Sequence, residues 1–196
     1  MTVPLFRRLV QSGARVACWA MWVPVVLVFR DTVGSFVLVE GRSMAPTLNP
    51  PGNMASDWMW LSKWGLGGAT DSNGSPIGYK RGDVVVLTSP SDPDKMLIKR
   101  LVATPGDWIK VKNECGVGGE GSGEGEGPSE RIVYVPKGRV WVEGDNPTQS
   151  RDSRKFGPVA LALVRGRCDW IVWPPTRLGR VERKEPDPSR FRSMSY

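Results

Sequence analysis

The sequence predicts a mostly β, barrel-like domain that follows a single apolar helix near the N-terminus. Many short apolar stretches, separated by turns that contain Gly and Pro, are typical of a small β-barrel or β-ribbon domain. One run without charge, Val16–Phe29, precedes all of these stretches and predicts the helix. The length of 196 residues fits one modest domain with a single core.

The helix is expected over residues 16–33, as a membrane anchor. Val16–Phe29 alone would extend about 21 Å, against a hydrocarbon core of about 30 Å. A full span is reached if the helix begins at Leu9 and the Arg15 side chain extends to the lipid headgroups. A segment that lies in the membrane interface and a buried core helix are the two alternatives. No small-residue cleavage site follows, so a removed signal peptide is not expected.

The charges around this helix predict its orientation. Arg7, Arg8 and Arg15 precede it, and no acidic residue occurs before Asp31. Basic residues favour the side of the membrane from which the chain is inserted. We therefore expect residues 1–15 and the β domain on opposite sides of the membrane.

Seven strands are expected after the helix, each a short run that is bounded by turn signals. They are Gly34–Glu40, Asp83–Leu87, Met96–Val102, Trp108–Val111, Arg131–Val135, Val140–Glu143 and Asp169–Val172. These strands place the globular domain at residues 34–178.

Two segments contain too few apolar residues to form part of the core. Residues 116–129 are rich in Gly and Glu and predict a flexible insertion between strands. Residues 179–196 predict a disordered tail. Cys115 and Cys168 either pair in an oxidising compartment or stay reduced. Trp58, Trp60 and Trp64 are expected in the loop after residue 48, either at the lipid headgroups or packed in the core or against another subunit.

The composition excludes several classes of function. The chain has a formal net charge of +7 and a pI near 9.6, but the basic residues are scattered or flank the apolar helix, which does not indicate nucleic-acid binding. It contains no histidine, which excludes a Ser-His-Asp triad and any histidine metal site. We expect neither a metal nor a cofactor.

Ser43, in the run Gly41-Arg42-Ser43-Met44-Ala45-Pro46-Thr47-Leu48, is a candidate nucleophile. A serine hydroxyl needs a base to accept its proton, and without histidine the remaining natural base is lysine. Lysine is charged at neutral pH unless burial among apolar groups lowers its pKa. The base should therefore be a lysine inside an apolar strand.

Lys99 is the lysine that meets this condition. It lies in Met96–Val102, where its neighbours on the same strand face are Leu97 and Leu101. Arg100 shares the apolar surroundings, but a guanidinium cannot be deprotonated in a protein. The pattern alone leaves an equal alternative, in which Lys99 and Arg100 form a charged pair at an exposed strand edge.

Three segments together resemble the conserved boxes of type I signal peptidases, and they occur in that family's order. They are the Ser43 segment, the segment Ile98–Asp107, and Gly144-Asp145-Asn146 followed by residues 150–159. The resemblance covers residues 16–178. Within the family it is strongest to the mitochondrial inner membrane peptidases of the subunit 2 type, because of the Ser-Met-x-Pro-Thr-Leu-Asn-Pro run and Trp173-Pro174-Pro175.

The resemblance implies a role for each matching residue. Ser43 would be the nucleophile and its backbone N–H an oxyanion donor. Lys99 would be the general base, and the Ser150 hydroxyl would orient its amine. Structural residues near the site would be the ion pair of Asp152 and Arg154, together with Gly144, Asp145 and Asn146. Bacterial members often carry a serine two residues before the nucleophile, whereas this chain has Gly41, so the second oxyanion donor is left open.

The resemblance also implies how the protein acts. A signal-peptidase-like catalytic domain at residues 34–178 would remove sorting or signal peptides from precursor proteins in the mitochondrial intermembrane space. The N-terminus would face the matrix. An extended substrate segment is expected to pair with the strand that contains Val37, Leu38, Val39, Glu40 and Gly41. Implied partners are the precursors, membrane lipid and a homologous second peptidase subunit, and no nucleic acid.

Two other functions are compatible with parts of the sequence. A noncatalytic membrane-tethered subunit would keep the fold and support an active partner, and Gly41 leaves this open. A self-cleaving repressor peptidase uses a similar Ser/Lys pair, but it carries a DNA-binding helix-turn-helix where this chain has the apolar helix.

Overall fold

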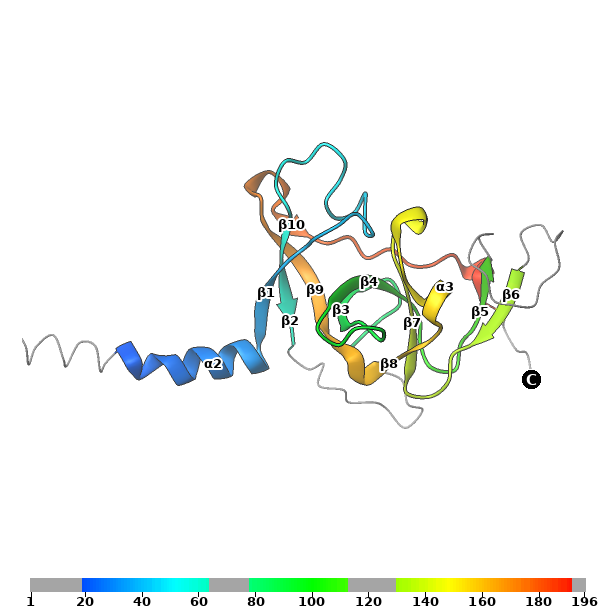
Figure 1. Cartoon of the computed structure of the whole chain (residues 1–196), viewed down its shortest axis with the longest axis horizontal. Coiled ribbons are helices and arrows are strands. Elements are labelled where there is room, and N and C mark those ends of the chain that lie inside the picture. The colour runs from blue at the N-terminus through cyan, green and yellow to red at the C-terminus, as the bar shows by residue number, and fades with distance from the viewer. Residues whose placement is uncertain (1–18, 64–77, 113–129, 192–196) are drawn as a thin grey trace, which may run out of the picture.

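The computed structural model describes residues 19–63, 78–112 and 130–191 of the chain. These residues form a mostly β domain with helix α2 projecting from one end (Figure 1). The strands are β1 Gly34–Leu38, β2 Trp58–Ser62, β3 Val84–Thr88, β4 Met96–Ala103, β5 Trp108–Lys112, β6 Glu130–Tyr134, β7 Arg139–Glu143, β8 Val159–Ala160, β9 Val164–Trp173 and β10 Gly179–Arg180. The helices are α2 Trp22–Thr32 and α3 Ser153–Phe156, with short 3-10 turns η1 Pro147–Gln149, η2 Leu161–Leu163, η3 Pro175–Arg177 and η4 Pro188–Arg190.

One curled antiparallel sheet contains eight of the strands. Their order is β1-β2-β9-β3-β4-β7-β8, and β10 pairs with β9 beside this path. Strands β5 and β6 form a separate ribbon at the far end of the domain (Figure 1). The predicted mostly β architecture is confirmed. The order leaves β1 at an edge of the sheet and places β3 and β4 in its interior.

Apolar side chains cover both faces of the interior strands. On one face, Val84 and Val86 of β3 lie in a cluster with Met44 and Leu48. On the other face, the neighbouring valine and leucine of β3 lie in a cluster with Leu101. Because both faces are buried, β3 is apolar from Val84 to Leu87 and lacks the alternation of a surface strand. Strand β4 pairs with β3 from Met96 to Arg100, and its burial increases along the strand, from the exposed Met96 to the buried Lys99 and Arg100.

The seven predicted strands all coincide with observed strands, although the prediction was incomplete. It missed β2, β8, β10 and the first half of β9. Trp58 and Trp60 belong to β2, not to a loop, and alternate with the buried Met59 and Leu61. The run is apolar at every position from 58 to 61, so it showed no period of two from which a strand could be predicted.

Helix α2 points away from the domain, and all of its side chains are exposed. The buried core helix, one alternative for this segment, is therefore excluded for residues 22–32. Within the described ranges, no helix combines the length and apolar character needed to cross a membrane. The structure thus does not support the predicted span over residues 16–33. Residues 16–18 of that span, and residues 1–15, lie outside the described residues.

The C-terminal segment differs from its prediction as a disordered tail. Residues 179–191, which we call the C-terminal strap, cross the domain from β10 to η4 beside β5 (Figure 1). Phe191 packs on the core cluster around Ile109 and Trp141, and Arg190 forms an ion pair with Glu143. Ion pairs and backbone contacts thus order a segment whose composition is polar.

Several other expectations lie outside the described residues. These are the insertion at residues 116–129, residues 192–196, Trp64 and Cys115. Cys168 is buried in the core as a free thiol, and burial raises its pKa to about 12.

Candidate active site

Ser43 lies in a loop that is anchored by the two apolar residues of its own motif. We call residues 39–49 the serine loop. Met44 and Leu48 are buried against β3, and the Leu48 N–H donates to the Met44 carbonyl at 2.9 Å. Arg42 on the other side of Ser43 is exposed. The motif therefore fixes Ser43 where the loop passes from solvent into the core.

The Lys99 amine meets the Ser43 hydroxyl directly. A hydrogen bond of 2.7 Å joins Lys99 Nζ to Ser43 Oγ, across 56 positions of sequence. Lys99 is only 2% exposed. Its burial lowers the pKa of the amine; Asp152 and Asp145 oppose this shift, and Arg154 adds to it. A lysine in this state can accept a proton from serine.

The alternative of a charged pair at an exposed strand edge is wrong. Strand β4 lies between β3 and β7, and both Lys99 and Arg100 are buried. Lys99 is opposite Val85, whereas Arg100 is opposite Glu143. Adjacent residues of a strand point to opposite faces, so the two cations are separated by the sheet.

Arg100 is held by Asp145, one of the predicted structural residues. Its guanidinium donates to both Asp145 carboxylate oxygens, at 2.8 and 2.6 Å. Thr47 of the serine loop donates to the same carboxylate at 2.6 Å. Burial would raise the pKa of Asp145, but the hydrogen bonds from Arg100 and Thr47 lower it below its ordinary value. Asp145 therefore stays charged and ties the serine loop to β4.

Gly144 and Asn146 lie against the backbone of Ser43. The Asn146 N–H donates to the Ser43 carbonyl at 3.0 Å. A Cβ at Gly144 would lie 2.5 Å from that carbonyl oxygen and 2.3 Å from Ser150 Oγ, both closer than real contacts allow. Position 144 therefore needs glycine for the serine loop to approach β7 and Ser150 this closely.

Ser150 and Arg154 both bind the Asp152 carboxylate. The Ser150 hydroxyl donates to Asp152 at 2.7 Å, the Gly144 N–H donates at 2.9 Å, and Arg154 forms an ion pair of 2.7 Å. Burial would raise the pKa of Asp152, but these hydrogen bonds lower it. Within the described part of the chain, no hydrogen bond joins Ser150 to Lys99, so its predicted role of orienting that amine stays a prediction.

The backbone N–H of Ser43 is open to an acceptor. No hydrogen bond of the described residues uses it. Gly41 has a φ of +78°, and a Cβ built there would meet no atom within 4 Å. Position 41 thus carries no side-chain donor, and the role of the Ser43 N–H as an oxyanion donor stays a prediction.

The strand predicted to pair with substrate corresponds to the edge strand β1, but only alternate residues of it have backbone groups that face the open edge. The Val33 carbonyl and the Val39 N–H bond to the chain around β2, and the pairing is regular between them. In an antiparallel ladder the bonded residues alternate, so the N–H and C=O groups of Leu38 and Glu40 face the open edge. Those of Val37 and Val39 face inward. A single sequence could not show which residues alternate in this way.

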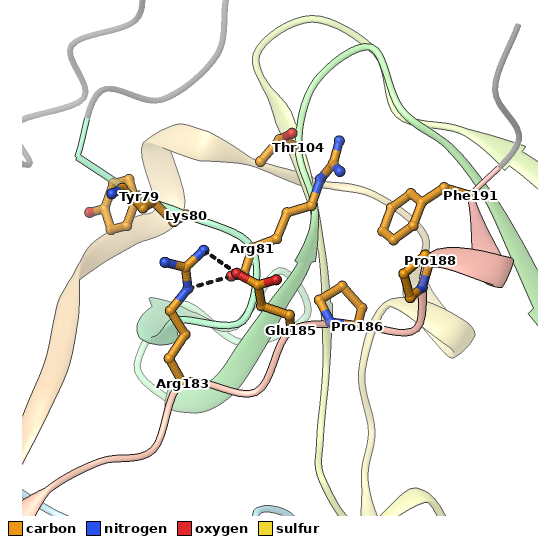
Figure 2. Close-up of a pocket in the computed structure, with 9 residues that line it drawn as sticks. All are labelled: Tyr79, Lys80, Arg81, Thr104, Arg183, Glu185, Pro186, Pro188 and Phe191. Carbon is orange, nitrogen blue, oxygen red and sulfur yellow. Dashed lines mark hydrogen bonds and ion pairs between the residues drawn. The ribbon is translucent and has the colours of Figure 1, made fainter.

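A pocket of about 550 Å³ lies elsewhere, between the C-terminal strap and residues 79–81 (Figure 2). Arg81 extends over the ring of Phe191 at 4.5 Å, and Arg183 pairs with Glu185 at 3.1 Å. Neither Ser43 nor Lys99 lines it. Both of its arginines have carboxylate partners, since Arg81 pairs with Asp107 and Arg183 with Glu185.

The sequence is similar to proteins of known family. Residues 13–117 and 118–173 match the family model described as signal peptidase, peptidase S26. The proteins named mitochondrial inner membrane protease subunit 2 from Danio rerio and Mus musculus are 37% and 38% identical to it, over 86% and 84% of this chain and 80% and 81% of theirs. The protein of the same name from Saccharomyces cerevisiae is 37% identical, over 81% of this chain and 78% of its own.

A solved signal peptidase I from Enterococcus faecalis V583 is 25% identical, with a TM-score of 0.35, and is matched over 45% of this chain and 95% of that one. The family model accounts for nearly all of the chain up to residue 173, and the relatives agree over most of their own length. The chain belongs to the signal peptidase family, peptidase S26.

Proposed function

We propose that the protein is a serine endopeptidase in which Ser43 is the nucleophile and Lys99 the general base. The observation that carries this proposal is the 2.7 Å contact between Lys99 Nζ and Ser43 Oγ. The same lysine is buried, with a lowered pKa, so its neutral form is accessible. Both requirements of an activated serine are then met without histidine.

The reaction proceeds in two halves. Neutral Lys99 takes the Ser43 proton while Oγ attacks the scissile carbonyl, and the Ser43 N–H donates to the oxyanion. The intermediate collapses, Lys99 returns the proton to the leaving amine, and an ester on Ser43 remains. Lys99 next takes a proton from water, whose oxygen attacks the ester, and the proton passes to Ser43 Oγ as the acid product leaves.

The surrounding residues position this pair. Asp145 connects the serine loop to β4 through Thr47 and Arg100, and Asn146 holds the Ser43 carbonyl. Asp152 lies near Lys99 as a charged group and opposes the shift of its pKa. We propose that Ser150 acts through Asp152, since its hydroxyl donates to that carboxylate.

The substrates are precursor proteins that carry sorting or signal peptides, delivered to the mitochondrial intermembrane space. The relatives named as mitochondrial inner membrane protease subunits support action at that membrane and support a multi-subunit peptidase, in which we propose a homologous second subunit as the partner. An extended substrate segment would add to the edge of β1, with its backbone bonded to Leu38 and Glu40. No cofactor or nucleic acid takes part.

The N-terminal segment that contains α2 attaches the domain to the inner membrane. The apolar side chains of α2 are exposed, and Phe29 lies 6.4 Å from the ring of Trp60 on β2. Aromatic side chains favour the headgroup layer, which supports a catalytic domain seated at the membrane surface. Extraction of membranes with carbonate at high pH tests the attachment, because release of the intact chain would contradict a single-pass anchor.

The experiment that tests the catalytic pair is cleavage of a sorting precursor by the chain, with and without its homologous partner. Ser43→Ala and Lys99→Met should each lower the rate by at least about 10³-fold. Lys95→Met is the matched control, because Lys95 lies in the same hairpin but is exposed and pairs with Asp92 at the turn. Cleavage at the wild-type rate by either dyad variant would refute the catalytic role, and partner-dependent cleavage that survives Ser43→Ala would indicate a supporting subunit instead.

A further inference from the structure

The same three side chains form hydrogen bonds to both ends of the serine loop, the stem before Ser43 (residues 39–41) and the stem after it (residues 47–49). The loop leaves β1 at Val39 and returns at Asn49, with Ser43 between these ends. Asn49, Asp57 and Arg177 together bond to carbonyls or amides on both stems. We call these three residues the brace.

Asn49 links the two stems directly. Its Nδ2 donates to the Val39 carbonyl at 2.7 Å and to the Gly41 carbonyl at 3.3 Å. Its Oδ1 accepts the Asp57 N–H at 2.8 Å. Asn49 also has a φ of +47°, a conformation that asparagine tolerates better than most residues. The residue thus ends the loop and fixes the peptide two positions before the nucleophile.

Asp57 and Arg177 hold the returning stem. Asp57 is fully buried, and its Oδ2 accepts the Asn49 N–H at 2.8 Å and a hydrogen bond from Arg177. A second Arg177 nitrogen donates to the Thr47 carbonyl at 2.8 Å. Arg177 follows β9 in η3, beyond the last residue matched by the family model.

We propose that the brace positions the catalytic serine loop and so keeps Ser43 within reach of Lys99. Carbonyls at 39, 41 and 47 surround Ser43 on both sides and are each bonded to the brace. Asp145 and Asn146 connect the loop to the segment that follows β7. The brace connects the same loop to residue 57, before β2, and to residue 177, after β9. This inference rests on the proposed function and adds positioning residues to it.

The test compares Asn49→Gly and Arg177→Lys with the wild-type chain in the precursor assay. Glycine keeps the positive φ and removes only the amide, while lysine keeps the charge and loses the fork that reaches both Asp57 and Thr47. Asn53→Gly and Arg180→Lys are the matched controls, because both side chains are exposed and lie outside the brace. We expect kcat to fall at least about tenfold in the brace variants, with KM within about twofold of wild type.

Hydrogen–deuterium exchange of residues 39–49 gives a readout that does not depend on activity. We expect faster exchange there in both brace variants and unchanged exchange in β3 and β4. Unchanged kcat together with unchanged exchange, or a rise in KM alone, would overturn the brace. If the wild-type chain itself cleaves nothing, the proposed function fails, and the exchange alone then decides whether the brace holds the loop.

Discussion

At the scale of single residues, the lowered pKa of the buried Lys99 is expected to decrease the stability of the folded protein. Lys99 is buried in the interior of the sheet, opposite Val85 of β3, and burial lowers the pKa of its amine. The folded protein therefore releases the proton of this amine at a lower pH than the unfolded chain does. At a pH between the two pKa values, the folded state loses a proton that the unfolded chain keeps, which costs free energy of folding.

We expect Lys99→Met to stabilise the protein at neutral pH while it abolishes cleavage. The unfolded chain binds the lysine proton up to a pKa near its ordinary value of 10.5, whereas the folded protein releases it at lower pH. Wild-type stability should therefore rise with pH between those two pKa values. Methionine carries no such penalty, and the gain should be about 1 kcal/mol at neutral pH.

Urea unfolding of both chains across the neutral to alkaline range measures this difference. The advantage of Lys99→Met should be largest at the lowest pH and shrink as the pH approaches 10.5. A variant that is less stable than wild type at every pH would show that the amine is not held against its ordinary protonation.

Gly144 is the glycine on which the geometry of the site depends most directly. In Gly144→Ala the new Cβ would overlap the Ser43 carbonyl and the Ser150 hydroxyl. Displacing the serine loop by about 1 Å should lower kcat about 10²-fold. Gly179→Ala is the control, since a Cβ there meets nothing within 4 Å. Steady-state kinetics measures the effect, and normal kcat in Gly144→Ala would mean that the loop relaxes without moving Ser43.

The sequence made Ser43 and Lys99 candidates but predicted less of their surroundings. The lack of histidine and the apolar neighbours of Lys99 indicated a lysine base, while the pattern alone left an exposed charged pair as an equal alternative, which the burial of Lys99 excludes. The contacts of Asn49 and Arg177 could not be predicted, because they join segments 128 positions apart (49 to 177) and depend on one carboxylate, Asp57. The direction of the Ser150 hydroxyl was likewise a matter of tertiary geometry.

At the scale of elements, β1 combines an attachment to the sheet with an open edge. Its residues alternate between groups bonded to β2 and groups that face outward. Strand prediction located β1 correctly within two residues, but it could not provide this alternation. Among the strands it missed, β2 pairs with β1 on one side and with β9 on the other, so the prediction lacked the strands that hold β1 in the sheet.

Proline scanning of β1 tests the proposed substrate edge. Leu38→Pro removes an outward N–H and should raise KM about tenfold relative to Leu38→Ala, with little loss of stability. Val37→Pro removes an N–H of the β1–β2 ladder and should destabilise the domain by about 3 kcal/mol. Michaelis–Menten kinetics and thermal unfolding separate the two effects. Equal KM for the proline and alanine variants at position 38 would argue against pairing of substrate with this edge.

At the scale of the whole molecule, the C-terminal strap connects the two ends of the domain. It runs from the edge of β9 to the β5–β6 ribbon (Figure 1). On the way, the Glu182 carbonyl accepts a hydrogen bond from the buried Arg100 at 3.2 Å. Composition predicted disorder here because the segment is charged and rich in proline. A backbone carbonyl that accepts a hydrogen bond from a buried arginine cannot be predicted from composition.

We expect a chain that ends at Val181 to be less stable by about 3 kcal/mol than one that ends at Phe191. The shorter chain loses the Glu182 acceptor of Arg100, the Arg190 partner of Glu143 and the packing of Phe191 on Ile109. The longer chain keeps all three. Because Arg100 retains Asp145, the dyad should stay assembled well below the unfolding midpoint, with kcat within a few-fold of wild type.

Thermal unfolding and cleavage assays on both chains measure these two effects of the truncation. Equal midpoints would show that the strap rests on the domain without holding it together, and a lost kcat at full folding would place the strap within the catalytic machinery.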